Sequence, residues 1–426
     1  MASDAPAARR QPRFNRAEWS WMFYDWANSA QTMIVAAVIL PILFKTLTKS
    51  AGIATFTADA YWGYATSAAT LLVALLAPLL GTLGDFRGYR MRLFTTFAGF
   101  GMVATAALGF VHNWQLMLVF YALSNFGFSA SNIYYDGFLV DVTTNERMDR
   151  VSSTGYGLGY IGGSTIPFVA AIVLLLYGDK LGLSASASQA IVFVMTALWW
   201  AGFTIPLWRN VRQVNWVEPG PNPVVQSFRR LGQTFTHVRA HRALFLFLLA
   251  YFFYIDGVGT IIHMATVYGD SLGLTSMDLV LALLATQLIG FPCAIAYGRL
   301  AERFGTRRMI GVGIGTYFVI CILGYFVNSF LTYLALAILV GTAQGGIQAL
   351  SRSYFGRLIP DRKQANEYFG FFDIFGKFAS FIGPALFGLV AQATGDSRFG
   401  VLSVLALFVL GGGMFLIAGR AEKETA

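Results

Sequence analysis

Five ionisable side chains lie inside long apolar stretches of the sequence, where burying a charge is costly. They are Asp25, Asp136, Asp256, Asp373 and Lys377. Ionisable residues within membrane-spanning segments usually mark an ion or substrate pathway. A carboxylate that loses its water readily binds a proton, and carboxylates also suit Na⁺. A lysine in the same setting offers a positive charge to an anionic group of a solute.

Polar side chains recur at helical spacing in four segments of the chain. Residues three and four positions apart share one face of a helix, so each set predicts a polar stripe. The four stripes are Asp25, Asn28, Ser29 and Thr32; Asn125, Ser129, Asn132 and Asp136; Asp256, Thr260 and His263; and Gln344, Gln348 and Ser351, which Arg352 follows. The candidate pathway residues are Asp25, Asn28, Asn132, Asp136, Asp256, His263, Gln344, Gln348, Asp373 and Lys377.

Several of these residues also have a structural interpretation. Asp25 and Asp136 lie near the ends of their segments, so they either carry protons or lock a gate. Asp373 and Lys377 are spaced i, i+4, which suits a structural ion pair as well as a site for an anionic group. His263 and the amides serve equally well in hydrogen bonds to the backbone or between helices.

The elements that must position these residues are membrane-spanning helices. Of 426 residues, 56% are hydrophobic and 12% are charged, whereas soluble domains carry about 25% charged residues. This composition excludes a disordered chain and a soluble enzyme. Because about 20 apolar residues cross a bilayer as a helix, the sequence predicts twelve spans. They are 20–47, 61–84, 92–111, 114–140, 153–177, 187–208, 243–268, 277–298, 308–327, 330–351, 367–393 and 399–418.

The net charge of +9 is explained by topology. With twelve spans, 25 of the 30 basic residues fall on the side that holds both termini. Positive residues accumulate on the cytoplasmic side of a membrane, so we expect a multi-pass protein of the cell (inner) membrane with cytoplasmic termini and no nucleic-acid partner. The predicted organisation is a tail at 1–19, a six-helix half at 20–208, a cytoplasmic loop at 209–242, a second half at 243–418 and a tail at 419–426.

The two predicted halves share an internal repeat with an offset of 217 residues. Residues 81–90 read GTLGDFRGYR, and residues 298–307 read GRLAERFGTR. The same offset maps Gly159 onto Gly376 and Pro167 onto Pro384. In such a loop the glycines permit a tight turn, and the acid can face the N-terminus of a neighbouring helix. The shared offset favours duplicated halves of six helices each.

The sequence contains no motif for catalysis, for a cofactor or for a metal. Residues 157–162 match G-x-G-x-x-G, but they lie inside an apolar span that no strand precedes. Gly155, Gly159 and Gly163 instead suggest close packing of helices. Cys293 and Cys321 lie in apolar runs without metal-ligand spacing. We therefore expect no enzyme activity, no cofactor and no metal site.

Both copies of the repeat have the form G-x-L-(A/G)-(D/E)-x-x-G-x-R, which resembles the loop signature of the major facilitator superfamily. The first copy departs from the usual pattern at Phe86 and Tyr89, where basic residues are common. The resemblance implies an all-α membrane protein with twelve transmembrane helices in two pseudo-symmetric six-helix halves. It also implies that these loops form a cytoplasmic gate between the halves. The gate residues would be Gly81, Asp85, Gly88, Arg90, Gly298, Glu302, Arg303, Gly305, Arg307 and Arg352.

Longer stretches resemble one branch of that superfamily. Residues 23–29 read FYDWANS, residues 159–163 read GYIGG, and residues 344–353 read QGGIQALSRS, with Leu-Ile-Pro at 358–360. These stretches are similar to the bacterial relatives of the autophagy-related vacuolar amino-acid effluxers. The fungal vacuolar branch exports amino acids, so the resemblance favours efflux of such solutes.

We therefore expect a secondary active transporter that moves a small polar solute, with amino acids as one candidate, by alternating access. Its partners would be the solute, the lipid bilayer and a coupling ion, with H⁺ favoured over Na⁺ because of the buried carboxylates. We expect a monomer. Two alternatives stay open: a flippase for lipids or lipid-linked substrates, and a transport-dead sensor on the same scaffold. The sequence leaves the substrate and the direction of transport open as well.

Overall fold

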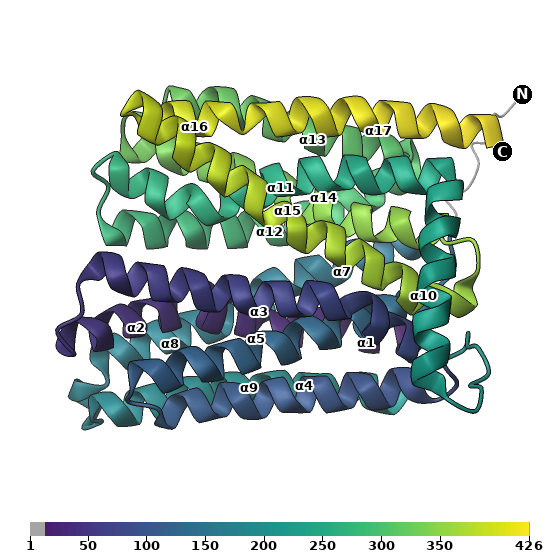
Figure 1. The fold of residues 1–426 in the computed structure, drawn as a ribbon. Helices are drawn as coiled ribbons and strands as arrows, with labels where there is room; N and C mark the ends of the chain where they lie inside the picture. Colours follow the sequence, from purple (N-terminus) through teal and green to yellow (C-terminus); the bar gives the residue numbers. More distant parts are fainter. Residues whose placement is uncertain (1–12, 426) are drawn as a thin grey trace, which may run out of the picture.

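The computed structural model describes residues 13–425, and every regular element in this range is a helix (Figure 1). The outer parts of the predicted tails, residues 1–12 and 426, lie outside the described residues. Twelve helical stretches are long and apolar enough to cross a membrane, which confirms the predicted number. They are Arg16–Ser50, Thr57–Gly84, Tyr89–Phe110, Trp114–Val142, Met148–Tyr177, Ala185–Asn210, Arg242–Ser271, Ser276–Phe304, Thr306–Tyr325, Phe330–Leu358, Arg362–Thr394 and Ser397–Glu422.

The first six spans form one half of the molecule and the last six form the other (Figure 1). The main helices of the first half are α1 (Arg16–Gln31), α2 (Ile39–Ser50), α3 (Thr55–Gly84), α4 (Tyr89–Ala107), α5 (Trp114–Gly137), α7 (Met148–Leu158), α8 (Ile166–Tyr177) and α9 (Ala185–Asn210). Those of the second half are α11 (Arg242–Ser271), α12 (Ser276–Phe304), α13 (Thr306–Tyr325), α14 (Phe330–Leu358), α15 (Ala365–Thr394), α16 (Ser397–Ser403) and α17 (Leu405–Thr425). Short π-helical turns, η1 (Thr32–Ala37) and η3 (Gly159–Thr165), interrupt the first and fifth spans.

Local sequence signals set where several helices begin. The Asn15 side chain accepts the backbone N–H of Glu18 at 2.7 Å, and the Glu18 carboxylate accepts the backbone N–H of Asn15 at 2.8 Å. Thr275 and Asp278 form the same reciprocal capping box at the start of α12. These boxes satisfy N–H groups that have no partner inside the helix, so each helix begins at a defined residue.

The connection between the halves contains a helix that the sequence did not predict. Residues 209–242 were expected to be a loop, yet α10 (Pro223–Ala240) lies across one end of the bundle, alongside both halves (Figure 1). We call this end the α10 end and the opposite end the distal end. The helix buries Ser227, Thr234 and Val238 and leaves Val224 and Phe228 half exposed or more. Its apolar residues alternate with polar and basic ones and form no long apolar run, so the segment does not resemble a membrane span.

Glycines let α7 and η3 pack closely against α1, as their spacing predicts. A Cβ on Gly155 would lie 2.5 Å from Asp25 Oδ2. A Cβ on Gly159 would lie 2.6 Å from Ser29 Oγ, and one on Gly163 would lie 2.4 Å from Ser29 Cβ. Only hydrogen fits at these positions, so the glycines fix the distance between the two helices.

The two halves approach each other most closely near the α10 end. The main contacts between them join α3 to α15 and join α7 to α12 and α14. A Cβ on Gly81 would lie 2.3 Å from the Asn366 carbonyl oxygen, and one on Gly370 would lie 2.6 Å from that of Ala77. Gly81 is in the last turn of α3 and Gly370 is in the second turn of α15. The halves are therefore closed on each other at this end.

Candidate functional site

Arg352 on α14 joins the two halves near the α10 end. Its Nη2 donates to Asp25 Oδ2 on α1 at 3.1 Å, and its Nη1 donates to Asp136 Oδ1 on α5 at 3.2 Å. Its Nε donates to Ser152 Oγ on α7 at 3.0 Å. Arg352 is only 4% exposed. One guanidinium of the second half therefore pairs with two carboxylates of the first half, away from water.

Three aromatic rings of the first half surround the same guanidinium. Its central carbon lies 4.6 Å from the ring centroid of Trp21, 5.4 Å from that of Tyr135 and 4.5 Å from that of Tyr156. Trp21 and Tyr135 stack on each other with their centroids 4.5 Å apart. The face of an aromatic ring attracts a cation, and more strongly where water is excluded. The rings therefore add to the binding of Arg352 by the first half.

Asp149 on α7 forms a second polar cluster between the halves. Its Oδ1 accepts hydrogen bonds from Arg357 Nη2 at 2.6 Å and from Ser353 Oγ, both on α14. Its Oδ2 accepts a hydrogen bond from Thr306 Oγ1 at the start of α13. Asp149 is 3% exposed. This carboxylate of the first half is thus held entirely by donors of the second half.

Asp85, at the end of α3, forms a third cluster with the N-terminus of α15. Its Oδ1 accepts the backbone N–H of Asn366 at 2.9 Å, and its Oδ2 accepts that of Glu367 at 3.2 Å. N–H groups in the first turn have no acceptor within their own helix, so they and the helix dipole favour an acid at this position. Arg90 donates to Asp85 Oδ1 at 3.3 Å. Burial raises the pKa of the Asp85 carboxyl to about 7, and the guanidinium groups of Arg90 and Arg230 oppose that rise.

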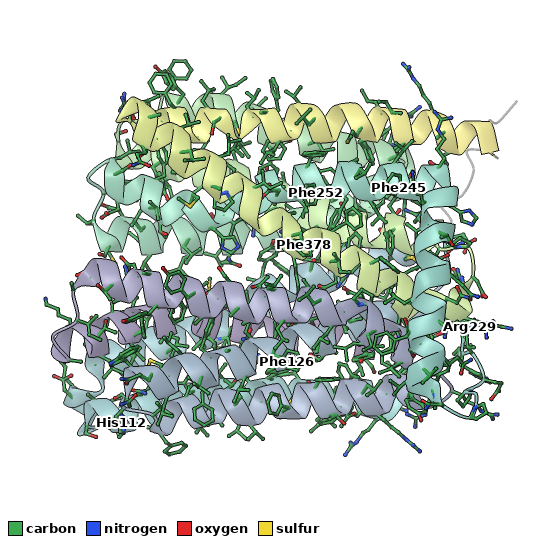
Figure 2. All side chains as sticks on the ribbon, viewed as in Figure 1. His112, Phe126, Arg229, Phe245, Phe252 and Phe378 are labelled. Atoms are coloured by element: carbon green, nitrogen blue, oxygen red, sulfur yellow. The ribbon has the colours of Figure 1, made fainter. Side chains whose placement is uncertain are left out.

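Arg230 extends this third cluster to α10. Its Nη2 donates to Asp85 Oδ2 at 3.4 Å and to Glu367 Oε2 at 2.7 Å. Asp85 belongs to the first half and Glu367 to the second, so a single side chain of the connecting helix contacts both. Arg229, one position earlier, is exposed on the outer side of α10 (Figure 2).

The second copy of the loop repeat makes different contacts from the first. Arg307 donates to the carbonyl oxygens of Gly419 at 2.8 Å and Leu416 at 3.2 Å, both on α17 of its own half. Gly298 packs across the interface, where its Cβ would lie 2.7 Å from Ser153 Cβ. The repeat is therefore symmetric in sequence, whereas the last arginines of its two copies differ in their contacts: Arg90 pairs with Asp85 and Asp141, and Arg307 caps carbonyl oxygens of α17.

The remaining loop residues shape the turns or the end of α12. Gly88 and Gly305 have positive φ angles of 76° and 91°, which favour glycine. Glu302 and Arg303 lie in the last turn of α12, and the guanidinium carbon of Arg303 lies 5.2 Å from the ring centroid of Phe304.

Two pairs of predicted pathway residues contact each other. Asn28 Nδ2 donates to Asn132 Oδ1 at 2.9 Å, which links α1 to α5 inside the first half. Lys377 Nζ donates to Asp373 Oδ1 at 2.8 Å along α15. The side chains of Lys377 and Asp373 are 18% and 22% exposed. Asp373 lies close enough to Asp136 in the other half for their charges to interact.

The other predicted pathway residues are dispersed. Asp256 is buried between α11 and α15, where its Oδ1 accepts the backbone N–H of Gly383 at 3.0 Å. His263, on the same predicted stripe, is exposed. Gln344 lines a cavity inside the second half, and Gln348 is partly exposed. The structure thus joins Asp25 and Asp136 through Arg352 but does not gather all ten candidates into one site.

Several residues of the three clusters were missed by sequence reasoning. Asp149, Arg357 and Glu367 lie near helix ends, where charged residues are common, and Arg230 lies in the connection between the halves, whose charges are explained by topology. A signal was nevertheless present, because Asp149 and Glu367 are acids at the helix N-termini of the fifth and eleventh spans. The sequence does not show which residue of the other half each of these side chains contacts.

Comparison with known proteins agrees with this architecture. The family described as "Vacuole effluxer Atg22 like" matches residues 15–425 of the chain. A relative from Bacillus subtilis, described as the uncharacterized MFS-type transporter YxiO, is 48% identical over 418 residues, which cover 97% of this chain and 96% of that protein. Autophagy-related protein 22-2 from Aspergillus clavatus is 27% identical over 60% of this chain and 46% of its own length.

Solved structures of low sequence identity share the fold. The transporter FucP in its outward conformation aligns with a TM-score of 0.70 at 14% identity, covering 95% of this chain and 98% of that one. The human organic anion transporter MFSD10 aligns with a TM-score of 0.69 at 13% identity, covering 95% of this chain and 100% of that one. Both support the major facilitator fold. With a family match over nearly its whole length, the chain belongs to the Atg22-like vacuole effluxer family.

Proposed function

We propose that the chain is a secondary transporter that moves a small polar solute by alternating access, coupled to protons. The observation that carries this proposal is the buried contact of Arg352 with Asp25 and Asp136, because it joins the two halves at one end only. Buried charges of this kind are stable when paired and are costly when one partner is removed. Water that enters between the halves would solvate all three groups, so the same contact can form and break.

The solute class is suggested by charge. Lys377 and Asp373 form a partly exposed ion pair of opposite signs, close to Asp136. A zwitterion can exchange partners with such a pair, its carboxylate with the lysine and its ammonium group with the aspartate. The vacuolar effluxer relatives and the sequence resemblance favour amino acids moved outwards.

The positive charges suggest how the protein is oriented. The topology predicted from the sequence assigns 25 of the 30 basic residues to the side of the termini, and the C-terminal end of α17 lies at the α10 end (Figure 1). Because basic residues accumulate in the cytoplasm, we propose that the α10 end is cytoplasmic. The closed contacts would then seal the cytoplasmic side, as in an outward-facing state.

Flux measurements in proteoliposomes test this function. The purified full-length protein is reconstituted, amino acids are loaded, and their movement is followed with and without an imposed pH gradient. We expect gradient-dependent flux with the native protein, and loss of that flux with Arg352→Gln because the gate then fails to close. Arg398→Gln is the matched control, since the Arg398 side chain contacts the Val327 carbonyl and Tyr268, both within its own half.

Three results would count against the proposal. Movement no faster than in empty vesicles would reject amino acids as the solute. A flux that is the same with and without the pH gradient would reject proton coupling. Gradient-driven flux that survives in both Asp25→Asn and Asp136→Asn would show that these carboxylates do not carry the proton, and would leave them as parts of the gate.

A further inference from the structure

Asp256 differs from the other three aspartates singled out inside the spans in having no cationic partner among the residues described. Asp25 and Asp136 pair with Arg352, and Asp373 pairs with Lys377. Asp256 is 1% exposed, and its Oδ1 accepts one hydrogen bond, from the backbone N–H of Gly383. Its Oδ2 is buried without a hydrogen-bond partner. An ionised carboxylate in this position would be very costly, whereas a protonated one carries no charge.

Thr260 completes the site, one helical turn along α11. It is 1% exposed, and its Oγ1 also has no hydrogen-bond partner. A Cβ on Gly383 would lie 1.8 Å from Thr260 Oγ1 and 2.8 Å from Asp256 Oδ1, so both oxygens lie around the same point of α15. A proton on Asp256 would turn an unpartnered acceptor into a donor, with the threonine oxygen beside it as acceptor.

A cavity of about 120 Å³ has Thr260 on its wall and extends from there towards the distal end. Thr260 and Gln344 lie on its wall in the middle of their helices, while Tyr268 and Tyr333 lie on its wall near the distal ends of α11 and α14. One water needs about 10–15 Å³ of such volume, so a chain of several waters fits. Most of the wall is apolar, and Thr286 and Gln287 add polar atoms.

We propose that Asp256, with Thr260 as its hydrogen-bond partner, binds the coupling proton and exchanges it with the distal side through this cavity. The role in coupling rests on the proton-coupled transport proposed above, whereas the protonation of Asp256 does not. The free oxygens of the site favour a proton over Na⁺. Among the side-chain oxygens described there, Asp256 Oδ2 and Thr260 Oγ1 are the unpartnered ones, and two oxygens are too few to replace the hydration shell of a metal cation.

The other ionisable groups near α11 lie apart from the site. On α15, Lys377 and Asp373 precede Gly383 by six and ten residues, which is about 9 Å and 15 Å at 1.5 Å per residue. None of the groups on α11 or on the helices packed against it contacts Asp256 in the part of the chain described. These groups are Arg242, Tyr251, Tyr254, His263, Tyr268 and Asp270 on α11; Arg229, Arg230 and Arg239 on α10; Asp278, Cys293, Tyr297, Arg299, Glu302 and Arg303 on α12; Tyr333, Arg352, Tyr354 and Arg357 on α14; Glu367, Tyr368, Asp373 and Lys377 on α15; Arg398 on α16; and Arg420 and Glu422 on α17.

Infrared spectroscopy of the full-length protein in lipid vesicles tests the protonation directly. A protonated carboxylic acid has a carbonyl band that a carboxylate and an amide lack. Protonated Asp85 and the ester groups of the lipid absorb in the same region but contribute equally to both proteins. We therefore expect this band, at neutral pH, in the difference between the spectra of the native protein and of Asp256→Asn, which keeps the size of the side chain. Asp373→Asn is the matched control and should leave the band in place, because Asp373 is ion-paired.

Two further measurements keep the proposal open to refutation if Asp256→Asn folds poorly. Thr260→Val should shift the band to higher frequency, because it removes the hydrogen-bond partner. Replacing choline by Na⁺ should leave the native band unchanged. A native-minus-Asp256→Asn difference spectrum without the band, or a difference band that Na⁺ abolishes, would overturn the assignment of Asp256 as a proton site.

Flux measurements then test the role of the proton. Asp256→Asn should still exchange solute across the membrane at equal concentrations, but it should lose accumulation driven by a pH gradient. Retained gradient-driven accumulation would refute the coupling role even if the infrared band is lost. If the native protein transports none of the solutes tested, the proposed function fails while the infrared result stands, so the two failures are distinguishable.

Discussion

At the scale of single residues, Arg352 has the most consequential environment in the molecule. It meets two carboxylates, one hydroxyl and three aromatic rings, all supplied by the first half. Such a guanidinium is well suited to the task because it is planar, always charged and rich in donors. Its removal leaves the buried Asp25 and the partly exposed Asp136 without a cation, so its loss should destabilise the whole closed state.

The first prediction is that Arg352→Gln lowers the free energy of unfolding by about 3–5 kcal/mol, the usual cost of removing one partner of a buried pair. Thermal unfolding in a fixed lipid or detergent measures this as a lower midpoint. The double variant Arg352→Gln/Asp25→Asn should recover part of the loss, because it removes one of the unpaired charges. A midpoint no lower than that of the control Arg398→Gln would contradict the role given to Arg352.

At the scale of secondary-structure elements, α10 connects the two halves and also contacts both of them. Arg230 reaches from it to Asp85 on one side and Glu367 on the other. The helix therefore contributes a side chain to the contact that closes the α10 end. Any parting of α3 and α15 at this end has to break at least one of these ion pairs.

The second prediction follows from that geometry. Arg230→Gln should open the α10 end more often, whereas Arg229→Gln should not, since Arg229 is exposed. The reporter is Ser153→Cys in a chain with Cys293→Ala and Cys321→Ala. Ser153 is 0% exposed, has no hydrogen bond from its hydroxyl and packs against Gly298 of the other half. Faster maleimide labelling of this cysteine with Arg230→Gln is the expected result; equal rates in both variants would refute it.

At the scale of the whole molecule, the contacts between the halves are unequal at the two ends. The clusters around Arg352, Asp149 and Asp85 all lie at the α10 end. The described cavity of the second half extends towards the distal end instead. The polar interface at one end and the cavity towards the other are the two features on which the proposed alternating access rests.

The third prediction concerns orientation. In intact cells, a membrane-impermeant maleimide should label Ala51→Cys, in the exposed turn at the distal end, and should spare Val214→Cys, exposed near the α10 end. Permeabilised cells should label both. The reverse pattern in intact cells would place the α10 end outside and would invalidate the orientation inferred from the basic residues.

Much of the fold follows from the sequence alone. The length and spacing of the apolar runs determine twelve spans, because a helix is the element that satisfies its own backbone hydrogen bonds in lipid. The i, i+4 spacing of Asp373 and Lys377 anticipates their ion pair, since such neighbours lie on one face of a helix. The four-residue spacing of Gly155, Gly159 and Gly163 likewise anticipates the close approach of α1.

What only the tertiary structure decided is which of these residues meet across the two halves. Asp25 and Arg352 are 327 positions apart, and no periodicity relates such distant segments. The stripe of Asp256, Thr260 and His263 is continuous in sequence, yet packing against Gly383 buries the first two and leaves the third exposed. The low charge content of the sequence thus identifies the costly residues, while the packing of one half on the other decides which of them are neutralised by a partner and which need a proton.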